Sequence, residues 1–102
     1  MSLLHTMNKS PFQHGTLRDC LTLCSPGDAL LLLEDGAYAA LASSPCREAL
    51  QHQINDGLSC YVLSADLNAR IHKQTLIEGI ELASDADFVD LVLQHSSTQS
   101  WY

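Results

Sequence analysis

The sequence has few basic residues. Its 102 residues include five Lys or Arg against twelve Asp or Glu, which gives a formal net charge of -7 at pH 7. The basic residues are scattered along the chain as Lys9, Arg18, Arg47, Arg70 and Lys73. Because contacts with nucleic-acid phosphates need a concentrated positive surface, we expect no direct binding of nucleic acid.

Long apolar runs and metal-type spacings are also lacking. No segment approaches the roughly 20 apolar residues of a membrane-spanning helix, and the first residues carry no secretion signal. The four cysteines show no CxxC spacing, and the five histidines show no mutual spacing typical of metal ligands. We therefore expect a cytoplasmic protein with free thiols, no bound metal and no contact with a membrane.

Signatures of the common nucleotide sites and hydrolases are missing as well. The sequence contains no GxGxxG, P-loop, GxSxG or HExxH motif, and its glycines stand singly in turns. No cofactor is expected. A stand-alone binder of a small ligand or nucleotide at Asp35-Gly36 is an alternative, disfavoured because no phosphate-cradling loop accompanies this turn.

The most informative stretch that is present is residues 28–36, which contains four consecutive leucines between a Ser-Pro-Gly breaker and an Asp-Gly turn signal. A short run of this kind predicts a strand that is covered on both faces, at the centre of an α/β sheet. Partners and ligands of parallel sheets usually meet the carboxyl ends of the strands. Glu34, Asp35, Gly36 and Tyr38 are therefore candidate interface residues.

Strand and helix patterns alternate along the rest of the chain. Further strands are expected at 3–7, 58–63 and 75–83, the last of them at a sheet edge. Helices are expected from Ser10 or Thr16 to Cys24, from 44 to 55, from 64 to about 71, and from Ser84 onward, with helix-forming composition also at 37–42. Phe88, Leu91 and Val92 should form the buried face of the last helix. The pattern predicts a single domain over residues 1–102, a three-layer α/β/α sandwich with a mainly parallel sheet of about four to five strands.

Two of the four cysteines lie one helical turn apart. Cys20 and Cys24 share an apolar stripe with Leu17 and Leu21, which favours core packing, although a thiol pair on one helix is the alternative. Cys46, in the first turn of its helix, has two interpretations. The helix dipole could lower its thiol pKa, or the side chain could be buried.

The sequence ends in Trp101 and Tyr102 after a polar segment. A terminal aromatic pair either folds back onto its own domain or anchors in another chain, and tryptophan and tyrosine suit both roles. Trp101 and Tyr102 are therefore candidate interface residues too.

Several short motifs, taken in order, carry a resemblance to a known family. They are Leu4-His5-Thr6, Ser10-Pro11-Phe12, Gly27-Asp28, residues 31–36, Tyr61-Val62-Leu63, Asp66-Leu67, Ala69-Arg70, Asp87-Phe88-Val89 and Gln99-Ser100-Trp101. Together they cover nearly the whole chain, which resembles the TusB/DsrH family. The presence of Cys20, with the stretches 8–12 and 38–41, leans toward the DsrH type.

The resemblance implies a DsrE/DsrH-like fold and a subunit of a sulfur relay. It implies partners of the TusC/DsrF and TusD/DsrE types in a heterohexamer. That complex passes persulfide sulfur from a TusA-type donor toward a TusE/DsrC-type acceptor, for 2-thiolation of the tRNA wobble uridine or for dissimilatory sulfur oxidation.

The resemblance also bears on catalysis. The principal sulfur-carrying cysteine of such complexes belongs to the TusD/DsrE subunit, so this chain is expected to act through interaction. The alternative is that Cys20, which matches a first-helix cysteine of some DsrH-type members, is itself a persulfide carrier of a sulfurtransferase.

Overall fold

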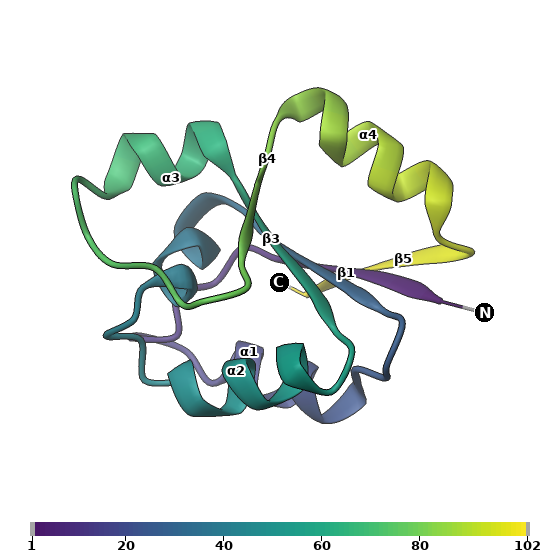
Figure 1. The fold of residues 1–102 in the computed structure, drawn as a ribbon, viewed down its shortest axis with the longest axis horizontal. Helices are drawn as coiled ribbons and strands as arrows, with labels where there is room; N and C mark the ends of the chain where they lie inside the picture. Colours follow the sequence, from purple (N-terminus) through teal and green to yellow (C-terminus); the bar gives the residue numbers. More distant parts are fainter. Residues whose placement is uncertain (1, 102) are drawn as a thin grey trace.

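The computed structural model describes residues 2–101 and contains one five-stranded sheet (Figure 1). The strands follow the spatial order β4-β3-β2-β1-β5, and every neighbouring pair is parallel. Their bounds are β1 Leu3–Met7, β2 Ala29–Leu32, β3 Ser59–Leu63, β4 Glu81–Ala83 and β5 Ser97–Trp101. The leucine strand is therefore central, as predicted, although shorter than residues 28–36.

Helices cover both faces of this sheet. The bounds are α1 Thr16–Leu23, the 3-10 helix η1 Glu34–Ala40, α2 Arg47–Asn55, α3 Ser64–Arg70 and α4 Asp85–Gln94. Figure 1 shows α1 and α2 on one side of the sheet and α3 and α4 on the other. The predicted three-layer α/β/α sandwich is confirmed. Among residues 2–101, no helix is both long and apolar enough to cross a membrane.

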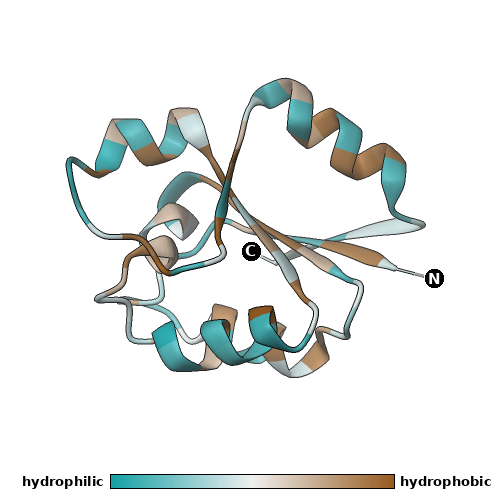
Figure 2. Ribbon diagram, viewed as in Figure 1, coloured by the Kyte–Doolittle hydropathy of each residue, from teal (hydrophilic) through white to brown (hydrophobic). Residues whose placement is uncertain are grey.

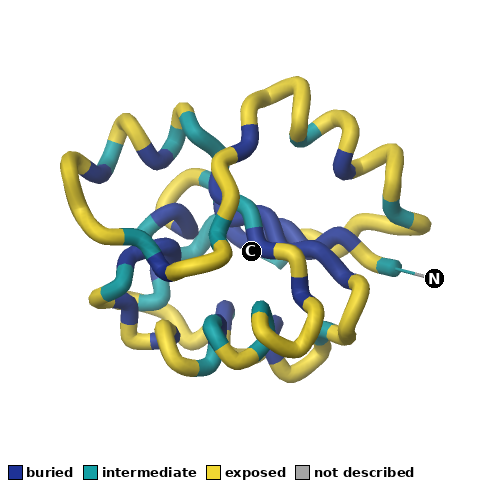
Figure 3. The backbone as a smooth tube through the Cα atoms, in the orientation of Figure 1, coloured by how far each residue is buried: buried dark blue, intermediate teal, exposed yellow. Residues whose placement is uncertain are grey.

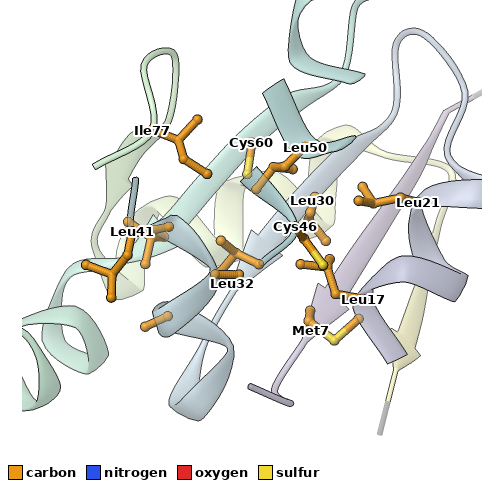
Figure 4. Packing of buried hydrophobic residues seen from close by; sticks show 14 of the residues in the cluster. Met7, Leu17, Leu21, Leu30, Leu32, Leu41, Cys46, Leu50, Cys60 and Ile77 are labelled. Atoms are coloured by element: carbon orange, nitrogen blue, oxygen red, sulfur yellow. The ribbon is translucent and has the colours of Figure 1, made fainter. Parts of the chain in front are cut away.

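The larger core lies between the sheet and α1 and α2 (Figure 4). Leu30 and Leu32 point into it from β2, where they meet Leu17 and Leu21 of α1 and Leu50 of α2. The smaller core, on the opposite face, contains Leu4, Ala29, Leu31, Ala83 and Leu91. Successive leucines of β2 thus serve opposite faces, which explains why the run has no polar alternation.

The structure selects one of the two expected starts of the first helix and moves the start of the second from residue 44 to Arg47. The first helix begins at Thr16, the later of the two expected starts, and its cap is Gly15 without a side-chain hydrogen bond. The backbone N–H groups of Gln13 and His14 instead donate to the Ser10 carbonyl, which makes a turn of that segment. The second helix is capped by Cys46, whose backbone N–H donates to Ser44 Oγ at 3.2 Å.

The predicted strand over 75–83 is wrong for most of its length. Only Glu81–Ala83 joins the sheet, as the expected edge strand beside β3. The earlier part pairs with the end of η1, because the Ile77 N–H donates to the Ala40 carbonyl and the Ala42 N–H to the Thr75 carbonyl, both at 2.8 Å. Residues 75–77 therefore close the loop after η1.

The structure also decides between the two interpretations of Trp101. Residues 97–101 form β5, which lies along β1 at the second edge of the sheet. Trp101 packs against the larger core, so the tail folds back onto its own domain. The other aromatic of the predicted pair, Tyr102, lies outside the described residues.

Candidate functional site

The predicted site at the carboxyl end of the leucine strand is a closed polar turn. Glu34 adopts a positive φ of 50°, and its backbone N–H donates to Asp66 Oδ2 at 2.7 Å. Asp35 accepts a 3.0 Å hydrogen bond from Arg70 Nε, and this contact raises the pKa of Arg70 above its usual value. These contacts tie the turn to α3.

Gly36 and Tyr38 serve the interior of the same turn. Gly36 is buried against β1, where a Cβ would overlap the Met7 carbonyl oxygen. Tyr38 is half-buried against the larger core. Of the candidate interface residues at this end of the sheet, Asp35 is exposed and Gly36 is not.

A second cluster, which we call the thiol cluster, lies at the amino end of the sheet and consists of His5, Cys20 and Cys24. One ligand atom from each, the two sulfurs and a ring nitrogen, lie within 4.8 Å of one another. The two Sγ atoms are 4.0 Å apart. Cys20 is fully buried in the stripe with Leu17 and Leu21, whereas Cys24 is partly exposed.

Both nitrogens of the buried His5 ring are hydrogen-bonded. Trp101 Nε1 lies 3.1 Å from Nδ1, and since an indole N–H only donates, Nδ1 is the acceptor. The ring proton is therefore on Nε2, which donates to Asp28 Oδ2 at 3.2 Å. Thiolate and imidazole groups are donors that zinc prefers, but a metal at the thiol cluster would have to displace Trp101 or Asp28 from the ring.

Asp28, only 4% exposed, anchors this end of the sheet. Burial raises the pKa of its carboxyl group, but the backbone N–H groups of Leu3 and Ser25 and the His5 ring outweigh burial and leave the pKa below its usual value. The carboxylate thereby ties β1 to the loop between α1 and β2.

The two thiols of the cluster have opposite pKa shifts. The S–H hydrogen bond to Cys24 and burial raise the pKa of Cys20, and the negative charge of Asp28 adds to the effect. The same hydrogen bond lowers the pKa of Cys24, against burial and Asp28. While both thiols are protonated either can donate, but once Cys24 is a thiolate only the Cys20 S–H can donate.

The other two cysteines are buried parts of the larger core. Cys46 is 4% exposed and packs there as the cap of α2. Burial raises the pKa of the Cys60 thiol in β3. Burial is therefore the interpretation of Cys46 that the structure favours.

An apolar surface on α4 is the third feature, and the sequence did not predict it. Phe88, Val89, Val92 and Leu93 line a shallow hollow, and we call these four residues the α4 patch. Val89 is 59%, Val92 41% and Leu93 77% exposed. Figure 2 shows the apolar residues along α4, and Figure 3 shows its exposed outer side.

The α4 patch corrects the predicted face of the last helix. Leu91 is buried and Phe88 half-buried, as expected, but Val92 is exposed. The reason is the small area of sheet beneath α4. The strand β4 has three residues, and the smaller core has five buried residues among those that the structure describes. This area cannot cover a helix that is apolar on more than one side.

The fold itself is shared with proteins of known structure. The crystal structure of the YchN protein from E. coli superimposes with a TM-score of 0.87 over 99% of each chain, at 15% sequence identity. The chain is therefore a small α/β protein with the YchN fold.

Sequence comparison narrows the class to a family. The family "DsrH like protein" matches residues 9–98. Protein TusB of Pectobacterium parmentieri is 32% identical and Protein TusB of Yersinia pestis strain Pestoides F 36% identical, each over 97% of this chain and 100% of the relative. The chain belongs to the TusB/DsrH family. Membership of this family supports a role for the chain as a subunit of a sulfur relay complex. It also implies that the complex contains TusC/TusD-like proteins.

Proposed function

We propose that this chain is mainly an interaction subunit of a heterohexameric sulfur relay complex in the cytoplasm. Its partners in the proposal are homologous subunits of the TusC/DsrF and TusD/DsrE types. The complex receives persulfide sulfur from a TusA-type donor and passes it toward a TusE/DsrC-type acceptor. The sulfur serves 2-thiolation of the tRNA wobble uridine or dissimilatory sulfur oxidation.

The observation that carries the proposal is the α4 patch. Leu93, Val89 and Val92 expose large apolar side chains side by side on one helix. Burying one such side chain contributes about 1.5–3 kcal/mol. Contiguous exposed apolar patches of this kind mark interaction surfaces. A homologous α/β subunit is the occupant that the family supports.

The charge of the chain is consistent with protein partners. The formal net charge of -7 and the scattered basic residues disfavour direct contact with tRNA. Acidic side chains of the first turn of α4, Asp85 and Asp87, lie next to the α4 patch in sequence and could form its polar rim. Recognition of tRNA would then belong to other members of the pathway.

The polar turn at Asp35 and Tyr38 is a second candidate surface for partners. Asp35 is exposed and already paired with Arg70, so a partner would meet an ordered ion pair rather than a free carboxylate. Gly36 supports the turn from inside. Trp101 packs against its own domain, which disfavours it as an anchor in another chain.

The alternative proposal, that Cys20 itself carries persulfide, faces an access problem. Cys20 is 0% exposed, so a donor could reach it only if α1 moved or if another thiol passed sulfur to it. A persulfide held there would be shielded from water and stray thiols, which favours a protected intermediate.

Co-expression with the two homologous subunits tests the proposal. We expect the chain to co-purify with both, and native mass spectrometry to give a hexamer with two copies of each. A chain that stays monomeric beside its partners would contradict the proposal. Measuring 2-thiouridine in tRNA from cells with and without the gene assigns the branch, because only the tRNA branch predicts its loss.

A further inference from the structure

The four cysteines differ in access to solvent. All lie within residues 2–101, where none forms a disulfide. Cys20, Cys46 and Cys60 are 0%, 4% and 3% exposed, whereas Cys24 is partly exposed. A sulfur donor that approaches the folded chain therefore meets Cys24 before any other thiol.

The surroundings of Cys24 come from four elements. Cys24 follows the last residue of α1 with an extended backbone, and Cys20 lies 4.0 Å away, sulfur to sulfur, on the same helix. His5 faces the pair from β1. Two further titratable groups interact with Cys24. They are Asp28, just before β2, and Cys60 in β3.

We infer that Cys24 is the thiol of this chain that accepts sulfur from a persulfide, and that Cys20 positions it through an S–H hydrogen bond. The inference rests on the proposed place in a sulfur relay and names the receiving atom. Cys24 is the catalytic residue because it forms the bond to sulfur. Cys20 is a positioning residue.

The transfer is a thiol exchange that needs no outside oxidant or reductant. The Cys24 thiolate attacks the outer sulfur of a donor persulfide R–S–S–H. A sulfur–sulfur bond forms on Cys24 while the donor's sulfur–sulfur bond breaks, and its electron pair leaves on the thiolate R–S⁻. The hydrogen stays on the transferred sulfur as Cys24–S–S–H, and R–S⁻ takes up the proton that Cys24 released.

Cys20 assists because it remains protonated. Once Cys24 is a thiolate, the buried Cys20 S–H, 4.0 Å away from sulfur to sulfur, is the donor of the pair and stabilises the negative charge before the attack. The pKa directions agree, with Cys20 raised and Cys24 lowered. Asp28 and burial oppose the thiolate on Cys24, so the hydrogen bond from Cys20 is the contact that favours it.

Loading of the full chain with cysteine persulfide tests the inference, with peptide mass mapping of all four cysteines as readout. We expect one added sulfur on Cys24, and none in Cys24→Ser. Cys20→Ser keeps an O–H donor and should load within about threefold of the parent rate. Cys20→Ala removes the donor and should load about tenfold more slowly at pH 7, with its rate profile shifted about one pH unit upward.

Several results would overturn the inference. Sulfur on Cys20, Cys46 or Cys60 of the parent chain, with Cys24 unmodified, would place the receiving thiol elsewhere, and this result needs no variant to fold. Equal rates and pH profiles for Cys20→Ala and the parent would remove Cys20 from the step. Assembly is measured separately, so a chain that assembles without loading contradicts only this inference. A chain that loads without assembling contradicts only the proposed function.

Discussion

Trp101 donates its indole N–H to Nδ1 of His5 across 3.1 Å, which joins the last strand of the sheet to the first. The ring planes are tilted by 36°, with centroids 6.3 Å apart. On its other side His5 donates to Asp28. The two hydrogen bonds of His5 thus link β5, β1 and the loop before β2. Because His5 also belongs to the thiol cluster, this polar network adjoins that cluster.

Removing the indole N–H should destabilise the protein. Trp101→Phe leaves the buried Nδ1 of His5 without its donor, at a cost of about 1–2 kcal/mol in the free energy of unfolding. Trp101→Ala also removes core contacts and should cost about 3 kcal/mol or more. Urea unfolding of both variants measures these losses. Equal stability of Trp101→Phe and the parent would show that the hydrogen bond contributes nothing.

Asp28 should make stability depend on acid pH. Its folded-state pKa is lowered, so the carboxylate contributes stability above its unfolded pKa near 4, and this contribution is lost as the pH falls through the lower folded value. Asp28→Asn should cost about 2 kcal/mol at pH 7, because an amide cannot accept all three hydrogen bonds. It should also flatten the stability curve below pH 4.

Urea unfolding between pH 2 and 7 checks the Asp28 prediction. Asp90→Asn is a suitable control because Asp90 is an exposed carboxylate on α4. Parallel pH curves for the parent and Asp28→Asn would contradict the assignment.

Gly36 should tolerate no side chain. A Cβ there would overlap the Met7 carbonyl oxygen, so Gly36→Ala must displace η1 or β1 and should cost about 2 kcal/mol or more. Gly15→Ala is the matched control, since no heavy atom lies within 4 Å of its Cβ position. We expect it to change stability by less than about 0.5 kcal/mol. Thermal unfolding that ranks the two variants alike would refute the packing argument.

The sequence predicted the central elements well because each has a local periodicity. The stripe of Leu17, Cys20 and Leu21 and the three leucines of β2 are buried as expected. The last helix begins after Ser84, as expected, and Ser84 and Asp87 form a capping box at its start. In these segments apolar spacing and local hydrogen-bonding residues are sufficient to define the element.

Features that depend on distant partners were missed. Residues 97–100 are polar and have no strand pattern, yet they form β5 because β1 offers an open sheet edge. The network of His5, Asp28 and Trp101 joins residues up to 96 positions apart. The exposure of Val92 depends on the width of the sheet, which a helical periodicity does not contain.

The α4 patch provides the most direct test of the interaction role. Leu93→Glu places a charge at its most exposed position, so it should leave the free energy of unfolding nearly unchanged while weakening association with the homologous subunits. Leu23→Glu, a leucine 63% exposed on α1, is the matched control.

We would measure the dissociation constant of the complex for the parent and both variants. A loss of at least about tenfold in affinity for Leu93→Glu, with Leu23→Glu unchanged, is the result expected from burial of the α4 patch. Unchanged affinity for Leu93→Glu would contradict it.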